Sequence, residues 1–120
     1  MFGNFIRTKR LENNMTLRDF CKSLNNEDSG NWSKVERKLI SPPQNFDKLQ
    51  KIAGILNIKE GSEDWEKLFD YSKIDAGHLP DFVTEEPNVL EILPIFLRTV
   101  KNVKPNREEL LMFIEDLKKL

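Results

Sequence analysis

The chain has 120 residues, 38% of them hydrophobic, and its 19 Lys and Arg nearly balance 20 Asp and Glu to give a net charge of −1. This size suits one compact domain, or a small domain with an appendage. A single Cys excludes a disulfide framework and a cysteine-based zinc site, and a single His excludes a multi-histidine metal site.

The first half of the chain is predicted to be a four-helix segment. Apolar spacing indicates helices over 2–12, 16–24, 28–37 and 47–56, and Ile58 is expected to close their shared core. Thr16 and Asp19 form a capping-box pattern, and Asp28 is a good N-cap. Ser41, Pro42 and Pro43 end the third helix because proline lacks an amide hydrogen.

The second half also lacks the alternation of strands, so the fold class is predicted to be all-α. Ser62 is expected to cap a helix over 63–72. Pro87 suits the first turn of the next helix, which Pro94 is expected to kink or divide. Asn106, with Glu109 three residues on, predicts the start of a last helix that carries an apolar stripe.

Charge divides these two halves. Residues 1–60 contain 11 Lys and Arg against 7 Asp and Glu, a net of +4, whereas residues 61–120 contain 8 against 13, a net of −5. We therefore predict two domains, 1–60 and 61–120, with a basic working surface on the first. The alternative is a chance distribution of charge.

The second and third helices carry the strongest functional signal. Two short helices joined by a polar turn, over about 16–38, are typical of a helix-turn-helix, in which the second helix enters the DNA major groove. Trp32, Val35 and Leu39 are expected to anchor that helix, leaving polar and basic side chains on its other face. The alternative is an ordinary solvated helix face in an all-α protein.

Three stretches of the first half resemble a known family. IRTKRLENNMTLRDFCKSL, NWSKVERKLISPP and LQKIAGILNI are similar, in order and spacing, to the Cro/C1-type (Xre) helix-turn-helix domain. The resemblance covers about residues 2–58. It implies a lambda-repressor-like five-helix domain, here with a helical C-terminal extension, that binds double-stranded operator DNA as a homodimer. Two positions depart from the family pattern: Asn25 stands where a turn glycine is common, and Lys38 where glycine often ends the third helix.

The resemblance also implies roles for individual residues. Arg10 and Glu36 match a partly buried ion pair that orients the recognition helix, the alternative being a weak surface pair. The positions that match DNA contacts, or flank them, are Thr16, Arg18, Ser29, Gly30, Asn31, Ser33, Lys34, Arg37 and Lys38.

The second half resembles the tails of small bacterial or mobile-element regulators, some of them antitoxin-like. An apolar set there is either internal core or a dimer or partner surface: Trp65, Leu110, Phe113, Ile114 and Leu117. No phosphate-binding glycine loop, calcium-loop spacing or nucleophile beside His78 is present, so no enzyme, cofactor or metal is predicted.

The predicted function is therefore a dimeric, sequence-specific DNA-binding repressor. The alternative is an antitoxin-like protein that neutralises a toxin partner and regulates its own operon. The most apolar stretch, 89–97, is much shorter than the roughly 20 residues of a membrane helix. The charged N-terminal segment is unlike a signal peptide, so a cytoplasmic location with no membrane association is expected.

Overall fold

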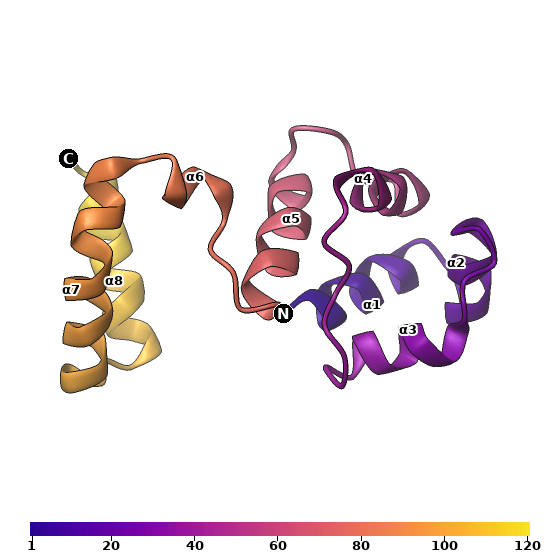
Figure 1. Ribbon diagram of the computed structural model, residues 1–120, viewed down its shortest axis with the longest axis horizontal. Coiled ribbons are helices and arrows are strands. Elements are labelled where there is room, and N and C mark those ends of the chain that lie inside the picture. The colour runs from indigo at the N-terminus through magenta and orange to yellow at the C-terminus, as the bar shows by residue number, and fades with distance from the viewer. The chain divides into compact units, whose positions relative to one another are not determined.

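The computed structural model describes all residues from 1 to 120, and it contains eight helices and no strand (Figure 1). The prediction of an all-α protein is confirmed. In chain order the helices are α1 Phe2–Glu12, α2 Leu17–Ser23, α3 Ser29–Glu36, α4 Phe46–Ile55, α5 Glu63–Asp75, α6 Asp81–Thr84, α7 Pro87–Val103 and α8 Arg107–Lys118. None of them combines the length and the apolar character that crossing a membrane requires.

The chain divides into two compact units, Met1–Pro80 and Asp81–Leu120. The boundary predicted at residue 60 is therefore wrong, because α5 packs on α1 and α4 and belongs to the first unit. Leu68 of α5 is fully buried there, and the side-chain amide of Gln44 donates to the backbone oxygen of Ser72 at 2.8 Å. Residues 1–80 hold 13 Lys and Arg against 12 Asp and Glu, a net of +1, and residues 81–120 hold 6 against 8, a net of −2, so the charge difference between the two units is smaller than that between the two halves.

The first unit has one continuous hydrophobic core built from all five of its helices and the segment after α4. Its edge-to-face ring pair, Phe20 and Trp32, joins α2 to α3 with centroids 5.1 Å apart. The buried members of the core are Phe2, Ile6, Phe20, Cys21, Leu24, Trp32, Val35, Leu49, Ile52, Ala53, Leu56, Ile58 and Leu68. Trp65 packs on this core, partly buried, so it takes part in the internal packing of the first unit.

Four of the predicted helix caps are present as side-chain hydrogen bonds. Thr16, Asp28, Ser62 and Asn106 each accept a backbone amide in the first turn of the helix that they precede. Such a cap typically stabilises a helix by about 1 kcal/mol. The fourth helix differs slightly from expectation, because Asn45 caps it and it begins at Phe46.

Helices α3, α5 and α7 differ from the sequence prediction, and α5 ends at Asp75 rather than at residue 72. Helix α3 stops at Glu36, and Lys38 adopts a left-handed φ of 64° where the family pattern has glycine. The chain therefore turns away, and Leu39, expected to face the core, is 62% exposed. Pro94 does not divide α7, which continues through it to Val103.

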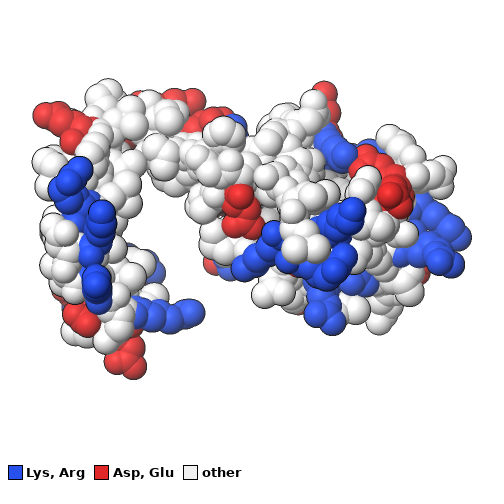
Figure 2. Space-filling model, turned by 60° about the horizontal axis from the view of Figure 1, so that its bottom comes forward, with Lys and Arg blue, Asp and Glu red and all other residues white.

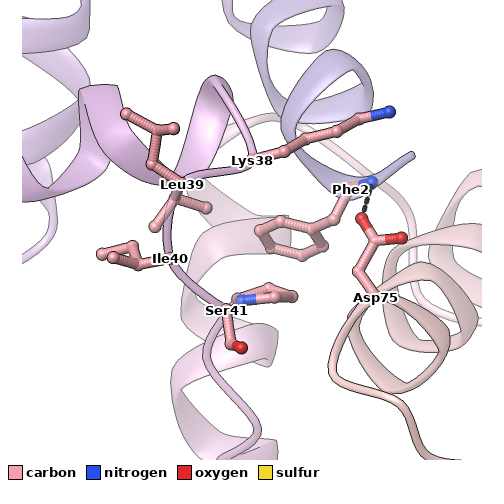
Figure 3. A pocket seen from close by; sticks show the side chains of 8 residues that line it. Phe2, Lys38, Leu39, Ile40, Ser41 and Asp75 are labelled. Atoms are coloured by element: carbon pink, nitrogen blue, oxygen red, sulfur yellow. Dashed lines mark hydrogen bonds between the residues drawn. The ribbon is translucent and has the colours of Figure 1, made fainter.

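The start of α1 is held by Asp75 at the end of α5. Its carboxylate accepts the Phe2 amide at 2.8 Å (Figure 3). It also accepts the Met1 ammonium at 3.2 Å. Burial alone would raise the pKa of Asp75, but these two hydrogen bonds outweigh it and lower that pKa. This contact ties the last helix of the first unit to its first helix.

The second unit is a short α6 followed by the α7–α8 hairpin. Phe96 and Phe113 stack between the two long helices with ring centroids 5.9 Å apart. No residue of α6, α7 or α8 is buried. The hairpin therefore has apolar surface on both helices but no enclosed core.

Candidate nucleic-acid interface

Helices α2 and α3 are joined by a tight turn whose backbone depends on two asparagines. Asn25 and Asn26 both have positive φ, at 54° and 56°. Asparagine tolerates this left-handed region better than other non-glycine residues. Asn25, which stands where the family pattern often has glycine, and its neighbour Asn26 therefore both adopt the left-handed conformation that such a turn requires.

Side chains from α4 fix this turn in place. One carboxylate oxygen of Glu27 accepts the Trp32 indole N–H at 3.0 Å, and the other pairs with the Lys48 ammonium at 2.7 Å. Burial would raise the pKa of Glu27, but these two partners lower it below the usual value. Lys51 also donates to the Asn25 side chain. No sequence pattern predicts this cluster, because Lys48 and Lys51 lie far along the chain from the turn residues that they contact.

The predicted ion pair between α1 and α3 is confirmed. The Arg10 guanidinium donates from Nε and Nη2 to the two carboxylate oxygens of Glu36, at 3.1 and 3.0 Å. Its third contact is the Met15 backbone oxygen, at 3.0 Å. The two paired side chains are only 10% and 9% exposed. A bidentate ion pair that is this well buried fixes the orientation of α3 relative to α1.

Gly3 provides a second fixed contact between the same helices, and no sequence pattern predicts it. A Cβ atom at this position would lie 2.5 Å from the Glu36 backbone oxygen and 2.7 Å from that of Val35. Only glycine allows the backbones of α1 and α3 to approach this closely. Together with the ion pair, this contact sets both the distance and the orientation of α3.

The outward face of α3 is left without internal partners. Trp32 and Val35 are buried on one side of the helix, whereas the side chains of Asn31 and Lys34 on the other side are exposed and make no hydrogen bond or ion pair within the chain. Ser33 beside them is half-buried. The outward face of α3 is therefore polar and positively charged, and the helix that carries it is held by the Arg10–Glu36 pair and the Gly3 contact.

A groove joins the first turns of α2 and α3. It has a volume of about 570 Å³. Its lining contains five of the predicted contact residues together with Leu17: Thr16, Arg18, Ser29, Gly30 and Ser33. The Gly30 amide is already held by the Asp28 carboxylate at 3.0 Å, and Thr16 shares its capping box with Asp19. The Arg18 side chain is exposed and has no ion pair.

The remaining two predicted residues lie at the other end of α3. Arg37 follows the helix as its C-cap and folds back so that its Nε donates to the Ser33 backbone oxygen at 3.3 Å. Lys38 lines a separate pocket of about 320 Å³ with Phe2 and Asp75 (Figure 3). The structure therefore places Arg37 and Lys38 outside the groove, next to the C-terminal end of α3.

Basic side chains gather on this side of the first unit. Figure 2 turns the lower side of Figure 1, where α3 lies, toward the viewer, and Lys and Arg atoms cover much of that face. The acidic caps at the groove are already satisfied by backbone amides. For Asp19, the hydrogen bonds from Thr16 lower the pKa of the carboxyl.

The remaining predicted residues lie on α8 in the second unit. Leu110, Phe113, Ile114 and Leu117 are all exposed, by 36–50% of their surface.

No group of three or more His, Cys, Asp and Glu side chains is arranged to hold a metal ion. Comparisons with protein-family models, curated proteins and solved structures find no match for this chain.

Proposed function

We propose that the protein is a sequence-specific DNA-binding transcriptional regulator whose first unit is a lambda-repressor-like helix-turn-helix domain. In this proposal α3 enters the major groove of operator DNA while α2 lies across the phosphate backbone. The protein acts as a dimeric repressor. The basis for the family assignment remains the resemblance of residues 2–58 to the Cro/C1-type pattern.

One observation carries the proposal. The outward side chains of α3 make no contacts within the chain, yet α3 itself is held in place by the Arg10–Glu36 pair and by the close approach of its end to Gly3. A solvated helix face needs no such support. A helix that reads base edges does, because hydrogen bonds to bases tolerate little displacement.

The chemistry of the exposed groups suits two kinds of contact. Lys34 and Asn31 can reach base edges, where Lys pairs with guanine and Asn with adenine. Arg18 and Thr16, at the start of α2, are placed for phosphate contacts that position the domain without reading sequence. Ser29, Gly30 and Ser33 line the groove between the two sets, where small side chains permit close approach.

The test is in vitro selection of duplex DNA on the full chain, followed by affinity measurements on the selected site. We expect the wild type to enrich one symmetric site. The Lys34→Ala variant should bind it more weakly by about 1–3 kcal/mol and lose preference at one base position in each half-site.

The matched control is Lys59→Ala, which removes an equal charge from an exposed position between α4 and α5. It should leave both affinity and preference unchanged. Selection that enriches no site, or equal losses in the two variants, would refute sequence-specific binding through α3.

A further inference from the structure

The α7–α8 hairpin exposes an amount of apolar side chain that it cannot cover itself. The large side chains exposed on its two helices are Val89, Leu90, Ile92, Ile95, Phe96, Leu97, Val103, Leu110, Leu111, Met112, Phe113, Ile114 and Leu117. The two helices touch through Phe96 and Phe113, but a two-helix hairpin has no third layer to cover the outer faces. An apolar surface of this kind marks an interaction site.

The most exposed of the α7 side chains form one stripe. Ile92, Ile95 and Val103 are 56%, 63% and 65% exposed, and the spacing of three and eight residues places them on one side of the helix. Thr99 lies between them, and its hydroxyl donates to the Ile95 backbone oxygen at 2.8 Å. The hydroxyl is therefore satisfied within α7, and the stripe can be buried without leaving it unpaired.

The distribution of charge along α7 indicates what covers this apolar surface. Glu86 caps its start and Glu91 follows in the first half, whereas Arg98 and Lys101 lie in the second half and Lys104 caps its end. Within the chain, Glu91 and Arg98 form no ion pair, although Lys118 and Lys119 of α8 pair with Glu115 and Asp116. A helix with one acidic and one basic half is complementary to an antiparallel copy of itself.

The positions agree in register. Glu91 and Arg98 stand equally far from the midpoint between Pro94 and Ile95, and they are seven residues apart, on one side of α7 next to Ile95. The two caps, Glu86 and Lys104, are centred within one residue of the same midpoint. A two-fold axis at that midpoint therefore sets each Glu opposite a basic residue of the other copy.

We propose that the hairpin is the self-association element of the protein, and that two copies form a four-helix bundle in which α7 pairs antiparallel with α7 of the second copy. The stripe of Ile92, Ile95 and Val103 forms the seam, Glu91 faces Arg98 of the other copy, and the α8 side chains cover the flanks. This inference assigns the dimer of the proposed function to a particular interface. It rests on the proposed function only in that the dimer would serve to bind DNA.

The first test is charge exchange, measured by sedimentation equilibrium of the full chain. The wild type should be a dimer. Glu91→Arg and Arg98→Glu should each raise the dimer dissociation constant by at least about tenfold, because each creates two like-charge contacts across the two-fold axis. The double exchange should return the constant to within about threefold of wild type.

The matched control is Glu115→Arg, which makes the same charge change on α8, at a residue paired within its own helix. It should leave the dissociation constant unchanged. Helix content by circular dichroism shows that each variant is folded. A monomeric wild type would refute self-association through the hairpin, and a double exchange that fails to recover would refute the antiparallel register.

The second test is cross-linking through a new cysteine, since the native Cys21 is buried. Ile95→Cys, next to the axis, should form a disulfide between copies under a mild oxidant. Asn102→Cys should not, because antiparallel helices place the two copies of that residue about 22 Å apart, and a disulfide spans at most about 7 Å between Cα atoms. A parallel pair would cross-link at both positions.

Failure of this inference can be told apart from failure of the proposed function. A monomeric chain that still selects a DNA sequence would refute the bundle and leave DNA binding standing. A dimer that passes both tests but selects no DNA would do the opposite.

Discussion

The two compact units use their apolar residues in opposite ways. Residues 1–80 enclose thirteen apolar side chains in one core, whereas no residue of the helices in 81–120 is buried. The second unit is nevertheless helical, with a full capping box at Asn106 and Glu109. Local signals are therefore sufficient to define its helices, while the self-association proposed above would supply the burial that the hairpin lacks.

The largest expected contrast between the units is in their response to salt. Arg18, Lys34, Arg37 and Lys38, with the exposed Arg7 of α1, would contact or approach phosphates, which gives a dimer roughly 6–10 neutralised phosphates. DNA affinity should therefore fall by about 10³–10⁵ between about 50 and 200 mM salt. Self-association, which is mainly apolar, should change by less than about tenfold. Fluorescence anisotropy and sedimentation over the same salt series check both. DNA affinity that does not respond to salt would contradict the basic interface.

The Arg10–Glu36 pair should affect only the first unit. Arg10→Met leaves the Glu36 carboxylate largely buried and unpaired, and it should lower the free energy of unfolding by about 3 kcal/mol. Replacing both residues, with Met and Leu, should cost less, because no buried charge remains. Urea denaturation gives the comparison. A single variant with wild-type stability would show that the pair is energetically unimportant.

Gly3 tests the spacing of α1 and α3 with a control in the same unit. Gly3→Ala should cost about 1–3 kcal/mol, because the new methyl group would overlap the backbone at Val35 and Glu36. Gly54→Ala meets no atom within 4 Å and lies inside α4, so it should stabilise the protein by roughly 0.4–1 kcal/mol. Thermal unfolding of the two variants should give shifts of opposite sign.

The smallest effect expected is in how stability changes as the pH falls below 7. Two carboxyl groups of α5 have pKa values shifted in opposite directions, lowered for Asp75 and raised for Asp70. The pKa of Asp75 is lowered in the folded state, so its contribution is present above its ordinary value and is lost as pH falls through the lowered pKa. Burial and Glu66 raise the pKa of Asp70, so its ionised form destabilises the protein above that pKa.

Asp75→Asn should therefore lower stability at neutral pH by less than about 1 kcal/mol and flatten the acid limb. Asp70→Asn should raise stability at neutral pH slightly. Unfolding midpoints between pH 3 and pH 7 distinguish them, and equal shifts in the two variants would contradict the assignment.

Local chemistry explains which features the sequence could predict. The caps at Thr16, Asp28, Ser62 and Asn106 depend on contacts within one helical turn, so they are visible in the sequence. The Arg10–Glu36 pair is a long-range contact, and it was predicted only through the family resemblance.

Features that depend on long-range packing were missed. Nothing near Gly3 in the sequence indicates that the end of α3 lies against it, and nothing near Glu27 identifies Lys48 as its partner. The domain boundary was wrong for the same reason, because the place of α5 is set by Leu68 in the core and by Asp75 at the start of α1. Charge composition contains no information about such packing.

The central claim is a division of labour, with DNA reading in the first unit and self-association in the second. The most direct measurement is sedimentation velocity of Lys34→Ala and Phe113→Asp, each alone and with the selected DNA duplex. Lys34→Ala should remain a dimer, bind the selected duplex more weakly and lose preference at one base position in each half-site. Phe113→Asp should become a monomer and lose DNA affinity only through the loss of the second binding site. A monomeric Lys34→Ala, or a dimeric Phe113→Asp that no longer binds DNA, would contradict the account.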